Sequence, residues 1–461
     1  MIELLNREHP QHRARKETWQ RHQDFYAGGD QLRRNAALYL VRRQKEPNEV
    51  YQERLSRVFY ENYLGSIVDW YAATLFRSEP AIQLGAPGEF YLEFLGDCDL
   101  GGRSFVEFCR RAFLEALVLN ESYALIDFPR VREKADTRAE EDALGKSRAY
   151  LVSYSPLELI NWRLDQRGNY EWVVLKTESV YQPAFLSDEE VVERRWRYYD
   201  KQSFRVYAQL ESSRRQEGST AAPALVDEGR HGLAELGRVP LVRMAVSDGL
   251  WLANKAALVA QEHFNKSNAL SWALHMGLFA IPVIYSEREW RQIVGEAYYI
   301  QLGPEDRFGW TEPEGHVYEL AAQNLDRLKD EIYRVCYLMT QAGGQEARNL
   351  GLSAASKQRD QIVTHEVLRA YGDVVKGFMR ETLRLIAAAR QDPAAVEVHG
   401  LDQFDVKDFS DELESARRLR DLDIGSGTFS REMQKRLALK YLEDSGQEVK
   451  NRVVAEIENR L

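Results

Sequence analysis

The sequence predicts an α+β protein that is mainly helical, and two observations carry this prediction. Apolar residues recur at intervals of three and four positions through most of the chain, which is typical of amphipathic helices. Between residues 150 and 210, polar and apolar residues instead alternate between turn sequences, which indicates antiparallel strands. We therefore expect helices followed by a sheet in the first 240 residues, and mostly helices in the remainder.

Length and charge limit what the chain can be. It has 461 residues, of which 44% are hydrophobic and 29% are charged, and a formal net charge of −10. Because single cores stop growing near about 250–300 residues, we expect roughly two to four domains. The acidic balance argues against nucleic acid wrapped in a basic groove, but it leaves open a channel through which DNA slides.

Signals for membranes, secretion and disulfides are missing from the sequence. Its longest apolar stretch, residues 276–284, is far shorter than the roughly 20 residues that a bilayer requires. The polar N-terminus, MIELLNREHPQHRARKE, does not predict a signal peptide. Cys98, Cys109 and Cys336 fit neither a disulfide framework nor a zinc site, so we expect a reducing cytoplasm.

Helices are predicted in order along the first 120 residues. Residues 1–57 carry twelve Lys and Arg against eight Asp and Glu, and we interpret this segment as a solvated helical arm broken at Pro47. A helix at 62–76 carries the core stripe Ile67, Val68, Tyr71 and Leu75 and stops before Pro80. Ser104 is the expected N-cap of a helix at 104–120 whose aromatic residues pack in the core.

The strand-rich block follows these helices. Strands are predicted at 150–154, 158–162 and 172–175, with the turn 165–168 between the last two. A hairpin pairs 193–199 with 204–210. Residues 212–232 are small and polar, and we predict a loop there.

The second half is predicted to be mostly helical. A helix at 254–276 leads through a short strand at 279–285 into a compact region that ends near residue 317 and holds seven acidic side chains against three arginines. An apolar stripe from Leu325 to Met339 predicts a helix that stops at Gly343-Gly344. After a polar interruption, one long helix covers 353–390 with a possible bend at its two glycines, and a strand follows at 396–398. A helical block at 407–461 has Ser430 as its expected N-cap.

Catalytic motifs are absent from this sequence. It contains neither a P-loop nor a nucleophile elbow, and the pair His9 and His12 lacks a third metal ligand. His365 is better explained as a hydrogen-bonding residue than as a general base. The glycine-bearing segment 343–351 has no preceding strand and no following lysine, so it predicts a flexible polar loop. The residues alone thus predict a self-associating α+β scaffold without catalytic residues, metal or cofactor.

Several segments occur in an informative order. They are 37–40 (ALYL), 51–57 (YQERLSR), 63–76 ahead of Pro80, 237–241 (GRVPL) and 423–431 (DIGSGTFSR), together with a helix, a glycine-bearing loop and a long helix at 319–390. In this order they resemble the portal protein of tailed bacteriophages. The resemblance covers nearly the whole chain and rests on the order and spacing of the motifs.

This resemblance implies the portal fold, with wing, stem, clip and C-terminal crown regions. It implies a wing at 1–240, a first stem helix at 241–276, a clip at 277–322, a second stem helix at 323–342, a tunnel loop at 343–352, a long return helix and wing strand at 353–406, and crown helices at 407–461.

The function implied by the resemblance is structural. A portal is a ring of about twelve identical subunits at one capsid vertex, and it forms the channel for packaging and ejection of double-stranded DNA. Large terminase docks on the clip, and head-tail adaptor proteins later replace it. Major capsid and scaffold proteins are further implied partners. The implied location is the virion, with the host cytoplasm during assembly, and no membrane, cofactor or enzymatic activity is implied.

Two sets of site residues follow from the resemblance. The tunnel loop places Gln345, Glu346, Arg348, Asn349 and Leu350 next to the DNA. There Arg348 either contacts phosphate or bridges to Glu346 of the partner subunit. The clip places six carboxylates, either as a docking patch for terminase or adaptor or as an ordinary solvated acidic region: Glu287, Glu289, Glu305, Asp306, Glu312 and Glu314. A mainly acidic channel would keep DNA mobile, because each Lys or Arg contact to phosphate raises affinity.

Two alternatives stay open beside the portal interpretation. One is another head-tail connector or a minor capsid protein, although simple connectors are shorter and lack the long return helix. The other is a cytosolic enzyme with an unrecognised site. The enzyme is disfavoured because the sequence shows no cluster of His, Asp, Glu or Cys at catalytic spacing.

Overall fold

The computed structural model divides the chain into two compact units. It describes residues 2–84, 89–130, 140, 144–145, 147–185, 188–212, 222–277, 281–285, 307–311, 315–338, 354–392, 395–402, 404, 417–418, 425–442 and 447–458. Unit 1 comprises Met1–Gln23, Val68–Ala253 and Gln361–Leu461, and unit 2 comprises Asp24–Ile67 and Asn254–Asp360. Both helices and strands are present and helices predominate, which confirms the predicted α+β class.

The N-terminal helices match the predicted segments but not the predicted exposure. They are α1 (Ile2–Leu5), α2 (Pro10–Ala27), α3 (Gly29–Arg34), a short 3-10 turn (Ala36–Leu38), α4 (Asn48–Ser56) and α5 (Tyr63–Leu75). The break at Pro47 is confirmed, because α4 begins at the next residue. The interpretation of a solvated arm is wrong, since Trp19 and Phe25 of α2 are buried. Because α2 has few but large apolar side chains, its sequence shows little helical periodicity.

Three helices form the core of unit 1. The second half of α5 packs with α7 (Phe105–Leu119) and α13 (Ala354–Arg390), because the ring of Tyr371 on α13 lies 5.6 Å from that of Tyr71 and 5.3 Å from that of Phe113. Ser104 caps α7 as predicted, with its side chain accepting a hydrogen bond from the backbone N–H of Glu107 at 3.2 Å. The short helix α6 (Glu89–Gly96) precedes α7.

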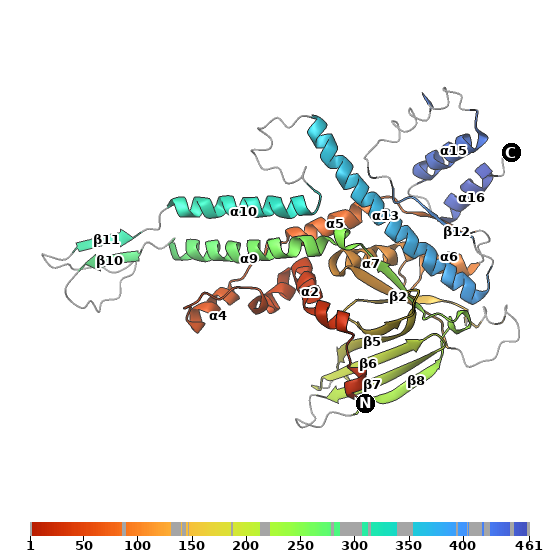
Figure 1. Cartoon of the computed structure of the whole chain (residues 1–461), viewed down its shortest axis with the longest axis horizontal. Helices are drawn as coiled ribbons and strands as arrows, with labels where there is room; N and C mark the ends of the chain where they lie inside the picture. Colours follow the sequence, from red (N-terminus) through yellow and green to blue (C-terminus); the bar gives the residue numbers. More distant parts are fainter. Residues whose placement is uncertain are drawn as a thin grey trace. The chain divides into compact units, whose positions relative to one another are not determined.

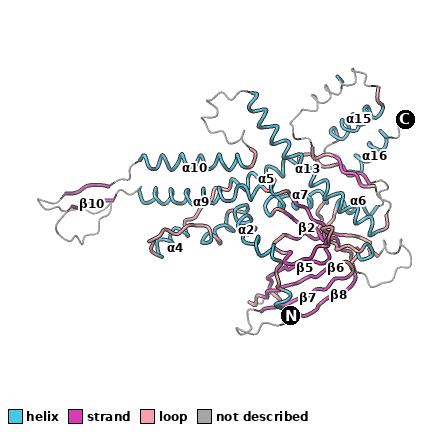
Figure 2. The backbone as a smooth tube through the Cα atoms, viewed as in Figure 1, coloured by secondary structure: helices cyan, strands magenta, loops and turns pink. Residues whose placement is uncertain are grey.

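Among its described residues, unit 1 contains a two-stranded ribbon of Ala81–Leu84 and Val396–His399 and two larger antiparallel sheets (Figure 2). In the smaller of these two sheets, β2 (Glu121–Asp127) lies between β3 (Tyr150–Tyr154) and β9 (Leu241–Ala245). The larger runs in sequence order through β4 (Leu159–Leu164), β5 (Tyr170–Tyr181), β6 (Val191–Asp200), β7 (Ser203–Ser212) and β8 (Ala224–Arg230). The predicted hairpins β4–β5 and β6–β7 are confirmed.

The predicted loop at 212–232 is wrong in its second part. There β8 pairs with β7 and forms the edge of the larger sheet. Its residues are mostly exposed, so a polar composition does not distinguish this edge strand from a loop. Gly229 stands opposite Phe204, and a Cβ atom at Gly229 would lie only 3.1 Å from that ring. Two 3-10 turns, Ala234–Leu236 and Asp248–Leu250, flank β9.

Most of α9 (Leu252–Gly277) belongs to unit 2, with β10 (Ile281–Tyr285), β11 (Arg307–Thr311) and α10 (Gly315–Val335). The predicted helix at 254–276 is confirmed. α10 begins eight residues before 323 and ends before the predicted stop at Gly343-Gly344, which lies outside the described residues. The early end coincides with Tyr337, whose φ of 63° is left-handed and incompatible with continuation of the helix.

The C-terminal part of unit 1 contains α13, β12 (Val396–His399), α15 (Gly427–Tyr441) and α16 (Gln447–Glu458). The long helix is confirmed as 37 residues, and β12 pairs with β1 (Ala81–Leu84). Ser430 is not the N-cap of α15: Ser426 precedes the helix and its hydroxyl accepts from the N–H of Phe429. Across the described ranges, no helix is long and apolar enough to span a bilayer.

Candidate functional site

Unit 2 is built around an antiparallel pair of helices, α9 and α10 (Figure 1). Three side-chain hydrogen bonds join them at 2.6, 2.9 and 3.4 Å, namely Lys255–Tyr337, Lys266–Asn324 and Tyr318–Ala273. Residue numbers rise on one helix as they fall on the other, which fixes the antiparallel direction. The strands between them in sequence form a hairpin in which Ile281 pairs with Thr311 and Tyr285 with Arg307. The result is a helical arm followed by a β-hairpin.

Both helices carry buried apolar side chains. Ile332 and Cys336 of the α10 segment are buried at helical spacing, and Ala256, Ala257 and Ala260 are buried on α9. Burial raises the pKa of the Cys336 thiol to about 12, so it stays protonated and cannot act as a nucleophile at neutral pH.

The outer surface of the pair carries apolar side chains in solvent. Four of them are between 42% and 61% exposed: Leu258 and Leu274 on α9, and Val317 and Leu320 on α10. Single exposed leucines are ordinary on protein surfaces, but a group of them on one arm is typical of surfaces that another chain covers.

A polar cluster borders the arm. His263 of α9 is buried, its Nε2 lies 3.4 Å from a carboxylate oxygen of Glu61, and Tyr63 donates to the same oxygen at 3.2 Å. Burial lowers the pKa of His263, although Glu61 opposes this effect, and burial together with Glu61 raises the pKa of Tyr63 to about 12. At neutral pH the histidine is therefore neutral and the phenol protonated. This cluster stabilises packing and offers no activated nucleophile.

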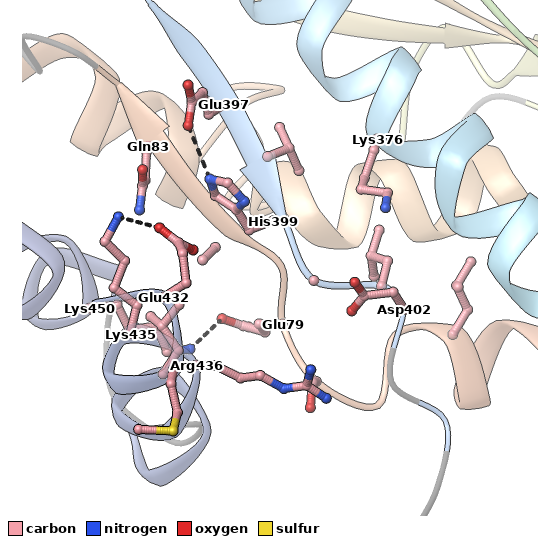
Figure 3. Close-up of a pocket in the computed structure, with 18 of the residues that line it drawn as sticks. Glu79, Gln83, Lys376, Glu397, His399, Asp402, Glu432, Lys435, Arg436 and Lys450 are labelled. Carbon is pink, nitrogen blue, oxygen red and sulfur yellow. Dashed lines mark hydrogen bonds and ion pairs between the residues drawn. The ribbon is translucent and has the colours of Figure 1, made fainter. Parts of the chain in front are cut away.

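A cleft of about 570 Å³ lies in unit 1 between α15, α16 and the β1–β12 ribbon (Figure 3), and we call it the C-terminal cleft. Several of its charged groups are paired. Lys435 lies 2.6 Å from Glu458 and 3.0 Å from Glu432, and these contacts raise its pKa. Lys450 is buried with a carboxylate oxygen of Glu79 3.9 Å away. The sequence did not point to this cleft, because it forms between segments more than 300 positions apart.

The C-terminal cleft lacks a recognisable catalytic arrangement among its described residues. Its histidine, His399, is half-exposed and lies 3.2 Å from Glu397 (Figure 3). Over the described ranges of the whole chain, no three His, Cys, Asp or Glu side chains come together as a metal site. Ionic pairs of this kind stabilise the position of the C-terminal helices rather than preparing a group for proton transfer.

The N-terminal histidine pair is part of the packing of unit 1. The ring of His9 stacks on Trp162 with centroids 4.0 Å apart, and His12 is buried with Nε2 3.2 Å from the carbonyl of Leu157. Burial lowers the pKa of both histidines. Packing in unit 1 therefore holds both histidine rings. His365 is partly buried 6.2 Å from the ring of Phe404.

All site residues named from the sequence lie outside the described residues. The tunnel-loop residues Gln345, Glu346, Arg348, Asn349 and Leu350 fall in 339–353, and the clip residues Glu287, Glu289, Glu305, Asp306, Glu312 and Glu314 fall in 286–306 and 312–314. Their roles stay predictions. In sequence, the first four clip residues belong to the connection between β10 and β11, and the last two to the connection between β11 and α10.

Comparison with solved structures finds similar chains in gene transfer agent particles. One belongs to a structure described as the neck of an empty gene transfer agent particle computed with C6 symmetry, with 13% identity, a match over 82% of this chain and 90% of that chain, and a TM-score of 0.42. Another belongs to the virion of a native gene transfer agent particle, with 12% identity, a match over 88% and 97%, and a TM-score of 0.41. Neither a protein-family model nor a curated protein matches the chain.

Proposed function

We propose that the chain is the subunit of a portal-type ring, the head-tail connector through which a phage-like particle packages and ejects its DNA. The observation that carries this proposal is the antiparallel pair α9–α10, with the β10–β11 hairpin between its helices and the 37-residue helix α13 after it. This order of elements is the one that the portal resemblance predicts for stem, clip, stem and return helix.

The regions of the ring are then assigned along the chain. We assign the wing to 1–240, the stem helices to α9 and α10, and the tunnel loop to 343–352. The crown corresponds to 407–461, including α15 and α16. Because α10 already begins at Gly315, we place the end of the clip at about residue 314 instead of 322.

The partners follow from this assignment. The clip receives large terminase during packaging and head-tail adaptor proteins afterwards, whereas major capsid and scaffold proteins contact the outer surface of the ring. The exposed side chains Leu258, Leu274, Val317 and Leu320 support self-association, because a ring covers such side chains with the neighbouring subunit.

Native mass spectrometry of the purified chain tests self-association. We expect a single closed species of about twelve subunits that persists on dilution, because ring closure gives each subunit two interfaces. A variant with Leu258→Glu and Val317→Glu is expected to dissociate, whereas Leu236→Glu, an exposed leucine outside the arm, is expected to stay assembled. A stable dimer would contradict the proposal.

A further inference from the structure

A strongly basic groove lies in unit 1, within the described residues. It consists of two adjoining clefts of about 850 and 490 Å³, which share Arg238 and Glu381. The turn between β4 and β5, the segment 237–239 and one face of α13 form its walls. Six arginines and one lysine line it against three carboxylates, and the arginines are Arg163, Arg167, Arg238, Arg243, Arg380 and Arg384.

Several of these charges are available to a ligand. Arg167, Arg380 and Arg384 form no ion pair with any residue that the structure describes, although Arg380 Nε donates to the carbonyl of Lys376 at 3.1 Å. Arg238 pairs with Glu381 at 3.2 Å and Arg163 with Glu171 at 2.8 Å, but both guanidinium groups remain exposed. A guanidinium has five N–H donors, so an exposed pair keeps donors for a second acceptor.

The lining points to phosphate groups rather than to a protein surface. The cores of protein interfaces are apolar and depleted in charge, whereas this groove is mostly polar and carries an excess of four positive charges. Arginine predominates over lysine, and its planar fork matches phosphate oxygens in a bidentate manner. Arg380 and Arg384 follow each other by one helical turn, about 6 Å, on the same face of α13.

The extent of the groove favours a long polyanion. Two adjoining clefts form a continuous path from the β4–β5 turn to α13, which is more than a single small anion occupies. Duplex DNA presents one phosphate charge for about every 1.7 Å of helix axis, so it can engage several of these arginines together. The net charge of −10 does not predict this groove, because acidic residues elsewhere in the chain outnumber the cations that line it.

We propose that this groove binds the phosphate backbone of double-stranded DNA independently of sequence, through residues other than those assigned to the stem helices and the tunnel loop. The inference rests on the proposed function only for the identity of its polyanion, since DNA is the cargo of a portal. It adds a second place of contact to the channel, where we expect few phosphate contacts.

Binding to a covalently closed DNA circle tests the proposal, because such a circle cannot thread a closed ring. Fluorescence anisotropy of a labelled circle is measured over a salt series for the wild type and for Arg380→Gln/Arg384→Gln. We expect about tenfold weaker binding of the variant at low salt. We also expect the slope of log affinity against log salt to fall by about 1 per lost contact.

The matched control is Arg369→Gln/Arg195→Gln. Arg369 lies on the same helix and is 58% exposed, and Arg195 on β6 is 44% exposed, but neither lines the groove. We expect the control to bind within about twofold of the wild type, because removing two charges elsewhere leaves the contacts in place. Thermal unfolding of each variant confirms that it is folded.

Three results would overturn the proposal. The first is a wild type that does not bind the circle, and the second is equal weakening by the control pair. The third is binding of polyglutamate as tight as that of DNA with the same dependence on Arg380 and Arg384, which would assign the groove to an acidic protein. If the chain forms rings that do not bind the circle, only the proposal of a DNA-binding groove is refuted. If the chain forms a dimer that binds the circle, only the proposal of a ring is refuted.

Discussion

Arg54 and Glu46 form a buried ion pair in unit 2. Arg54 donates to both carboxylate oxygens at 2.9 and 2.8 Å, and the two side chains are only 5% and 2% exposed. Burial alone would favour the neutral acid, but the hydrogen bonds from Arg54 hold the pKa of Glu46 below its ordinary value. The pair connects the segment after Tyr39 to α4.

Removing one partner of this pair should be costly. We expect Arg54→Met to lower the free energy of unfolding by about 3 kcal/mol, because Glu46 is left buried without a counter-ion. The control Arg57→Met removes a half-exposed pair with Glu53 and should cost less than about 1 kcal/mol. Urea unfolding measures both, and equal costs would contradict the account.

Glu115 of α7 makes stability depend on pH in the opposite direction from most carboxylates. Burial, reinforced by the charge of Glu158, raises the pKa of Glu115 to about 8. Its folded-state pKa therefore lies above its unfolded value, so its contribution is complete below about pH 4.5 and is lost as pH rises towards 8. We expect Glu115→Gln to be more stable than the wild type at pH 8.5, by at least about 1 kcal/mol, and to match it at pH 4. Thermal unfolding at both values decides, and a variant that is less stable at pH 8.5 would contradict the assignment.

Single residues also show where sequence reasoning reaches its limit. The N-cap at Ser104 was predictable because a serine preceding an apolar helix has one common role. The grouping of Arg380 and Arg384 with Arg238 in one groove was not predictable, because the groove forms from segments of unit 1 that are far apart in sequence. The only local signal was two arginines at helical spacing, and this pattern also occurs on any solvated helix face.

At the level of elements, the two glycines of α13 differ in their surroundings. A Cβ at Gly372 would lie 2.1 Å from the carbonyl oxygen of Leu401, so this glycine permits close packing of helix and loop. At Gly377 a Cβ would meet nothing within 4 Å. α13 runs uninterrupted through both glycines, and neither glycine requires a bend in the helix.

Alanine substitution should separate these two glycines. Gly372→Ala is expected to destabilise by about 2 kcal/mol, because backbone must move to admit the methyl group. Gly377→Ala in the same helix is expected to stabilise by about 0.5–1 kcal/mol, because alanine has the higher helix propensity. Denaturant unfolding measures both changes, and a shift of the same sign in the two variants would contradict the packing.

Helices whose apolar residues recur with a clear helical period could be predicted from the sequence. Strands and helix ends that depend on neighbouring segments or on one backbone conformation could not. α7, α9 and α13 each carry an apolar stripe over several turns, and the sequence places all three within a few residues. β8 was missed because an exposed edge strand lacks alternation. The end of α10 was misplaced because the left-handed Tyr337 stops the helix before the glycines that suggested a stop.

The whole molecule consists of two compact units. Unit 2 contains the arm α9–α10 with its hairpin, and unit 1 contains the two larger sheets, most of α13 and the basic groove. Separate pieces of sequence contribute to each unit, so the division could not be drawn as a single linker from composition alone.

The tunnel-loop assignment predicts a separation of assembly from packaging. Deletion of residues 343–351 should leave the ring largely intact, because the exposed apolar side chains that we assign to self-association lie on α9 and α10, and should abolish DNA packaging. Native mass and a packaging assay measured on the same preparation test this. Normal packaging by an assembled deletion variant would refute the assignment.

The central claim, that this chain closes into a ring around an open channel, is tested most directly by negative-stain imaging of the purified protein. The account predicts radial rings of about twelve subunits around a central hole. Compact dimers with a closed centre, or a chain that stays monomeric even with capsid and scaffold proteins, would contradict it.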